Sequence, residues 1–155
     1  MRHIYDSSNS YCTTKTPNKV RVEKDYKTIY KSVNARIKDY DNKQIIGWKK
    51  AKLDGANCLV QLKINPRALR YQPLNKKCRA SSAKVIGIYD INSSKSNLKK
   101  LPQKMVHSQY DYNFFYEVDK TVRPRHKFDK DHTQECTSGI HFFLTLDEAK
   151  NYNLN

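Results

Sequence analysis

Histidine and cysteine gather near the end of the chain, around the run ECTSGIHFFLTLDEAKNY at 135–152. Within 16 residues stand His126, His132, Cys136 and His141, and Cys78 lies further upstream. Zinc accepts such mixed ligands, but structural zinc sites usually contain a tight Cys-x-x-Cys or similar knuckle, which is missing here. The pattern therefore predicts no metal site. It favours a half-exposed strand histidine beside a cysteine that packs as a small apolar residue.

The same run leaves two catalytic alternatives open. Cys136 would be a nucleophile if a cationic neighbour lowered its pKa and His132 or His141 came close in space. GIHFF, followed by an alanine and Tyr152, is also similar to the GIYF…A..Y segment of ADP-ribosyltransferases, in which the tyrosine stacks on nicotinamide. That likeness implies a nucleotide pocket lined by Cys136, Gly139, His141 and Tyr152. The His-Gly-Thr-type strand of those enzymes has no counterpart, since IIGWKKAK is a poor substitute.

Basic residues form another candidate site. The chain of 155 residues has a net charge of +15, and residues 43–104 hold 15 Lys or Arg against two acids, a local +13. This asymmetry predicts one positive face for a phosphate-bearing partner, with Trp48 and Tyr71 placed to stack on bases. The candidate cations are Lys49, Lys50, Lys52, Lys63, Arg67, Arg70, Lys76, Lys77, Arg79 and Lys84. The expected partner is nucleic acid or an acidic protein, with no cofactor.

Codon bias offers a simpler explanation of that charge. Lys outnumbers Arg by 22 to 8, and Asn, Tyr and Ile, whose codons are AT-rich like those of Lys, are also abundant. Dedicated phosphate-binding sites often favour the bidentate Arg fork. A solvated surface of genome-biased lysines is therefore the alternative to a binding face.

The closing run predicts a strand followed by a capped helix. Ile140, Phe142 and Leu144 alternate with more polar positions, as in a strand with one buried face. Thr145 and Glu148 form a capping-box pattern. Leu146, Ala149 and Tyr152 share a helix face that is expected to dock on the sheet.

The remaining pattern predicts an α+β domain, mostly an antiparallel sheet of five to six strands with two to three short helices. Strands are expected at 42–52, 58–64, 84–91 and 112–118, with Asp54-Gly55 as a turn. Residues 1–19 read as a flexible N-terminal arm and 20–155 as a single globular domain, in which 20–43 is ambiguous between strand and helix. Residues 92–104 and 123–138 read as loops.

The chain contains neither a signal-peptide pattern nor an apolar run of membrane-spanning length. We therefore expect an intracellular protein that is not secreted. Its four cysteines are expected to be free thiols, since no secretory context favours disulfides.

Three segments carry a family resemblance: IIGWKKAK with LVQLKI, then NKKCRASSAKVIGIYD, then YEVDKTVRP through DEAKNY. Over about 43–152 they resemble an uncharacterised domain family of giant amoeba-infecting DNA viruses and phages, often found after pentapeptide repeats. That family usually has glycine where this chain has Asp119. The resemblance implies a viral accessory or virion-associated protein, located in the host cytoplasm or the virion, and supplies no reaction. The expected function is a basic, non-enzymatic binding or interaction module. The alternative is an enzyme with an ADP-ribosyltransferase-like pocket near Gly139–Tyr152.

Overall fold

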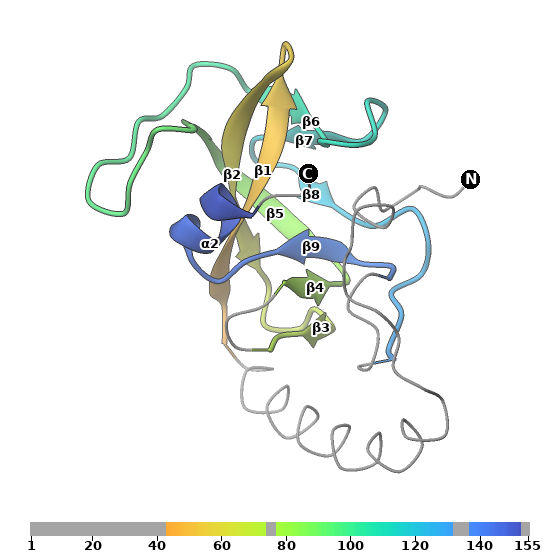
Figure 1. Ribbon diagram of the computed structural model, residues 1–155. Helices are drawn as coiled ribbons and strands as arrows, with labels where there is room; N and C mark the ends of the chain where they lie inside the picture. Colours follow the sequence, from red (N-terminus) through yellow and green to blue (C-terminus); the bar gives the residue numbers. More distant parts are fainter. Residues whose placement is uncertain (1–42, 74–76, 132–136, 153–155) are drawn as a thin grey trace.

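The computed structural model describes residues 43–73, 77–131 and 137–152 of the chain. In this part nine strands form two antiparallel sheets, and the one helix is short (Figure 1). Sheet A has the strand order β7-β6-β1-β2-β5-β8, and sheet B the order β3-β4-β9. The elements are β1 (Ile45–Leu53), β2 (Ala56–Ile64), β3 (Arg70–Tyr71), β4 (Cys78–Ala80), β5 (Ala83–Asp90), β6 (Met105–His107), β7 (Phe115–Glu117), β8 (Thr121–Val122), β9 (Ile140–Phe142) and α2 (Leu146–Asn151).

The β1–β2 hairpin confirms the predicted turn. Asp54 and Gly55 have φ angles of 51° and 84°, as the two central residues of a type I′ turn require. The register pairs Leu53 with Ala56 and continues to Ile45 with Ile64. Even-numbered residues of β2 therefore face the core, and odd-numbered residues face outward.

Sheet A curls so that its two edge strands, β7 and β8, lie close together. β7 and β8 are the two ends of the strand order, yet residues 118–120 alone connect them. A flat six-stranded sheet would be about 24 Å wide, whereas the connection can reach only about 14 Å. The corner is held by hydrogen bonds from Asp119 N to Val85 O (2.7 Å) and from Val85 N to Lys120 O (2.9 Å).

Asp119 forms this corner without a glycine. Its φ of 71° lies in the left-handed region, which aspartate tolerates better than most residues do. The turn therefore forms with Asp119 at the position where the resembled family usually has glycine, at a conformational cost of about 1 kcal/mol.

One apolar core serves both sheets. Sheet A supplies Leu62, Ile64 and Val85, and sheet B supplies Ile140 and Phe142. The two sheets also join directly: Trp48 and Phe143 exchange backbone hydrogen bonds of 2.8 and 2.7 Å. β9 thus crosses β1 closely, which ties the end of the chain to the centre of sheet A.

The helix covers part of the outer face of sheet A. Thr145 is the N-cap, and its Oγ1 accepts a hydrogen bond from Glu148 N at 3.1 Å, so the predicted cap is confirmed. Leu146 and Ala149 are buried against Trp48 and Leu59. The predicted docking of this helix on the sheet is also confirmed. No helix among the described residues is long and apolar enough to cross a membrane.

The predicted α+β class is wrong for the part of the chain that the structure describes, which is mostly antiparallel sheet with nine strands and one short helix. β3, β4, β6 and β8 were not predicted, because strands of two or three residues are too short to show a period of two. The predicted single buried face of 140–144 is also wrong: His141 and Phe143 are buried as well as Ile140 and Phe142. Residues 1–19 and the ambiguous segment up to 42 lie outside the described residues.

Candidate anion-binding site

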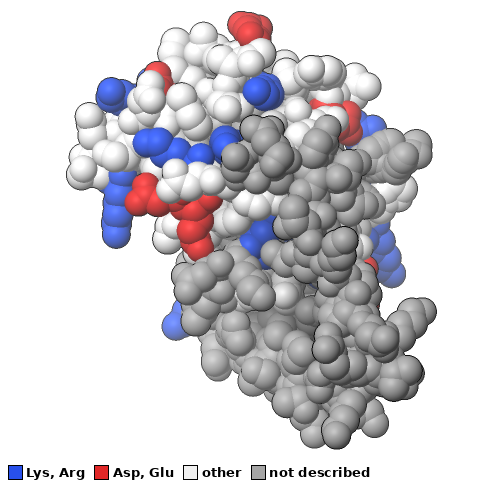
Figure 2. All heavy atoms as spheres, viewed as in Figure 1, with Lys and Arg blue, Asp and Glu red and all other residues white. Residues whose placement is uncertain are grey.

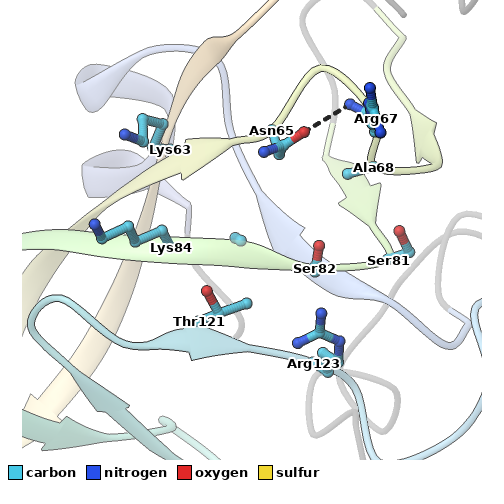
Figure 3. Close-up of a pocket in the computed structure, with 10 residues that line it drawn as sticks. Lys63, Asn65, Arg67, Ala68, Ser81, Ser82, Lys84, Thr121 and Arg123 are labelled. Carbon is cyan, nitrogen blue, oxygen red and sulfur yellow. Dashed lines mark hydrogen bonds between the residues drawn. The ribbon is translucent and has the colours of Figure 1, made fainter.

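A hollow of about 540 Å³ opens on the outer face of sheet A, beyond the end that α2 covers (Figure 3). Three segments form its walls: the end of β2 with the turn after it, the start of β5 with the residues before it, and β8 with the residue after it. Its lining residues are Lys63, Asn65, Arg67, Ala68, Ser81, Ser82, Ala83, Lys84, Thr121 and Arg123.

Strand pairing sets one wall of the hollow. Lys63 pairs with Lys84 across β2 and β5, and Lys84 pairs with Thr121 across β5 and β8. Directly paired residues point to the same face, so these three side chains form a row with a spacing of about 5 Å. Their neighbours Val85 and Val122 face the core and anchor the row.

A fixed turn sets the opposite wall. Asn65 Oδ1 accepts a hydrogen bond from Arg67 N at 2.8 Å, and Asn65 O accepts one from Ala68 N at 3.0 Å. The same carbonyl accepts a bond from Arg70 Nη2 at 2.6 Å. Arg70, which the sequence predicted as a ligand, is buried and supports the turn from inside. This leaves Arg67 as the exposed cation of that wall.

Among the residues that the structure describes, the lining contains four cations and no carboxylate. Lys63, Arg67, Lys84 and Arg123 all belong to it, together with the hydroxyls of Ser81, Ser82 and Thr121. Arg125 and Asp111 form an ion pair outside this hollow. Like charges directly opposite each other in a sheet are destabilising, so the Lys63–Lys84 pair has a structural cost. An anion in the hollow would offset this repulsion and could be held by Arg forks and hydroxyl donors.

The predicted cations of β1 divide between two faces. Lys50 and Lys52 lie on the outer face, where burial and the charge of Lys52 lower the pKa of Lys50. Lys49 points inward, and its Nζ donates to Tyr116 Oη at 2.6 Å while it lies 4.8 Å from the ring centre. Adjacent strand residues alternate between faces, so a run of lysines in sequence does not form one cluster in space.

Two other predicted cations lie inside the protein. Lys77 is buried, with Nζ 3.2 Å from Tyr152 Oη and 5.2 Å from its ring centre. Arg79 is fully buried between the rings of Tyr71 and Phe128, at 5.1 and 5.0 Å. Neither reaches the hollow, and Lys76 lies outside the described residues.

The residues of the proposed nucleotide pocket have packing roles. A Cβ added to Gly139 would lie 2.9 Å from Arg79 Cβ, so this glycine permits a close approach between two segments of the protein. The ring of Tyr152 packs on Phe143 at 4.9 Å. His141 is buried, with Nε2 2.8 Å from Thr137 O. Cys136 and His132 lie outside the described residues.

The buried histidine predicts acid sensitivity. Burial, then the charges of Lys77 and Lys49, hold the pKa of His141 well below 6.5. In the unfolded chain the imidazole of His141 therefore takes up a proton near pH 6.5, whereas in the folded protein it stays neutral at that pH. Stability should be unaffected by this group above pH 6.5 and should fall below it, by at most about 1.4 kcal/mol per pH unit.

This expectation is checked by urea unfolding at a series of pH values from about 7.5 to 5.5, a window below the ordinary histidine pKa and above that of carboxylates. His141→Gln should flatten the loss of stability as pH falls. His126→Gln, at an exposed position, is the matched control. An unchanged slope in His141→Gln would contradict the role assigned to His141.

The prediction of free thiols is confirmed for Cys58 and Cys78, which are both buried. Burial raises the pKa of Cys58 to about 11, so its thiol is protonated and unreactive at neutral pH. Cys78 Sγ lies 3.7 Å from Pro73 O. Among the described residues, no three His, Cys, Asp or Glu side chains gather at one point.

Sequence reasoning missed Arg123, Thr121, Ser81 and Ser82. Arg123 was assigned to a loop, because β8 has only two residues and shows no period. The one available signal was that Thr121 and Arg123 flank Val122, as outward residues flank an inward one. Only pairing with β5 shows that this outward side faces Lys84.

Comparison with known proteins places the chain among viral relatives. It is 29% identical over 147 residues to the uncharacterized protein L223 of Acanthamoeba polyphaga mimivirus, an alignment that covers 89% of this chain and 90% of that protein. No solved structure matches the chain. A sequence profile for a family of unknown function, DUF5758, matches residues 26–149. The chain therefore belongs to the DUF5758 family of unknown function.

Proposed function

We propose that this protein is a non-enzymatic accessory module of a giant virus that binds nucleic acid through phosphates held in the hollow. The observation that carries the proposal is the described part of the lining: four cations from three separate segments, with no carboxylate among these residues. A surface of lysines that reflects codon bias alone would be expected to intersperse acids. It would also have no reason to set Lys63 opposite Lys84.

Phosphate is favoured over the carboxylates of an acidic protein by the kind of donors present. Arg67 and Arg123 offer planar forks that match phosphate oxygens, and the three hydroxyls add short-range donors. Lys50 and Lys52 extend the positive outer face of sheet A. In Figure 2 one group of acidic side chains lies at α2 and others lie at separate places on this face, among Lys and Arg side chains.

The direct test is fluorescence anisotropy with a labelled single strand of mixed sequence across a salt series. Three or four phosphate contacts predict a slope of log K against log salt of about −2 to −3. Replacing Lys63, Lys84 and Arg123 together by glutamine should weaken binding about 10- to 100-fold at low salt and should make the slope shallower by about 2. The matched control is Lys99→Gln, Lys100→Gln, Lys104→Gln, which removes the same charge from exposed positions outside the hollow.

The hollow variant should remain folded. Removing the Lys63–Lys84 repulsion is expected to leave its melting temperature equal to that of the wild type or slightly higher. The control variant should lose no more than about threefold in affinity, through its effect on overall charge. Two results would oppose the proposal: no detectable binding by the wild type at low salt, or equal losses in the two variants.

A further inference from the structure

We infer that the hollow takes a terminal phosphate, such as the phosphorylated end of a strand or a free polyphosphate, in preference to the internal phosphodiesters of a chain. This inference rests on the proposed function and narrows the ligand of the same site.

The first argument is the concentration of charge. Lys63 and Lys84 stand on β2 and β5, Arg123 directly follows β8, and Arg67 lies on the facing turn, around one hollow of about 540 Å³. A groove that follows a chain spreads its cations along a path, because each internal phosphate carries a single charge. A phosphate monoester carries about −1.5 to −2 and three free oxygens, and a polyphosphate end carries more. Four cations around one hollow match the charge of such a compact group.

The second argument is what the hollow lacks. Within the described ranges of the chain, its apolar lining residues are Ala68 and Ala83, and no aromatic side chain lines it. Sites that hold a continuous strand usually provide aromatic rings on which successive bases stack. Here the lining residues that the structure describes offer donors for phosphate and no aromatic surface for a base. The phosphate would therefore enter while the attached sugar and base stay outside.

The third argument is the arrangement of the donors. In Figure 3, Lys63 and Lys84 lie on one side of the hollow and Arg67 and Arg123 on the other, with Asn65 between the two groups and Ser82 near Arg123. Donors on several sides suit a group with oxygens in several directions, such as a monoester. The turn at 65–68 is held by hydrogen bonds from Arg67 N, Ala68 N and Arg70 Nη2, so this wall is formed before a ligand arrives.

The test compares one short strand in three forms, ending in a hydroxyl, a phosphate or a triphosphate at the same end. For the full-length protein at low salt, we expect about tenfold or greater tightening from hydroxyl to phosphate, and more for triphosphate. The variant Lys63→Gln, Lys84→Gln, Arg123→Gln should bind all three forms alike. The control Lys99→Gln, Lys100→Gln, Lys104→Gln should keep the preference.

Inorganic triphosphate as a competitor identifies the source of the phosphate. Displacement of the phosphorylated strand at similar concentrations would assign the site to free polyphosphates, and displacement only at much higher concentrations would assign it to a strand end. Equal affinity of the wild type for the three strands would overturn this inference while the proposed function stood. Failure of every strand and of the competitor to bind would overturn both.

Discussion

Replacing Arg79 by methionine is expected to lower the free energy of unfolding by about 3–5 kcal/mol. The guanidinium is fully buried and donates through Nη1 to Asp129 O at 2.7 Å and to Ser138 O at 3.0 Å, and through Nη2 to Asp131 O at 3.0 Å. It therefore ties the long connection after β8 to β4. Methionine fills a similar volume but satisfies none of these carbonyls.

Urea unfolding followed by circular dichroism checks this expectation. Arg125→Met is the matched control, because Arg125 is exposed and its ion pair with Asp111 at 3.1 Å should contribute less than about 1 kcal/mol. Arg79→Lys should also be strongly destabilising, since one ammonium cannot reproduce the fork. If Arg79→Met lost no more stability than Arg125→Met, the buried fork would not be what holds this connection.

The second large effect is expected from Gly47→Ala, about 2–3 kcal/mol of lost stability from overpacking. A Cβ at this position would clash with Phe142 Cδ2 and lie 2.9 Å from Phe142 Cγ. Phe142 is fully buried, and the neighbouring Trp48–Phe143 backbone bonds hold β9 against β1. Neither the ring nor the strand can move away without breaking other contacts.

A double mutant separates this clash from a loss of backbone freedom. Phe142→Leu should be destabilising alone, yet part of the cost of Gly47→Ala should disappear in the Phe142→Leu background. Gly87→Ala is the control, because its Cβ would meet the side chain of the partly exposed Tyr89, which can rotate. Strictly additive losses for Gly47 and Phe142 would rule out the close contact as the cause.

Local patterns predicted local structure well. The Asp54-Gly55 turn, the strands on either side of it, the strand at 83–90 and the Thr145 cap all depend on neighbouring residues in sequence. Such features can be read from a period of two, from turn residues with positive φ and from a capping box. The fold class failed because several strands of two or three residues owe their existence to pairing with distant partners.

In the candidate site, too, the residue types could be predicted from the sequence and their positions in space could not. Its basic residues could be listed from sequence, but Lys49 and Lys50 are neighbours that face opposite sides, and Arg70, Lys77 and Arg79 are inside the protein. A cation that looks like a surface ligand in sequence can be satisfied by buried carbonyls or aromatic rings. Proximity along the chain therefore overstated the size of the basic cluster.

By itself, the sequence determined the hairpin, the capped helix, the family and the excess of positive charge in residues 43–104, because each depends on residue type and short-range spacing. Only the tertiary structure decided which of these cations line the same hollow. Strand register sets Lys63 beside Lys84. The pairing of β8 with β5 then brings Arg123 to the same hollow, although the lining residues on β2 and β5 lie about 40 to 60 residues earlier in the sequence. Register and closure come from burying one common core, which no local pattern encodes.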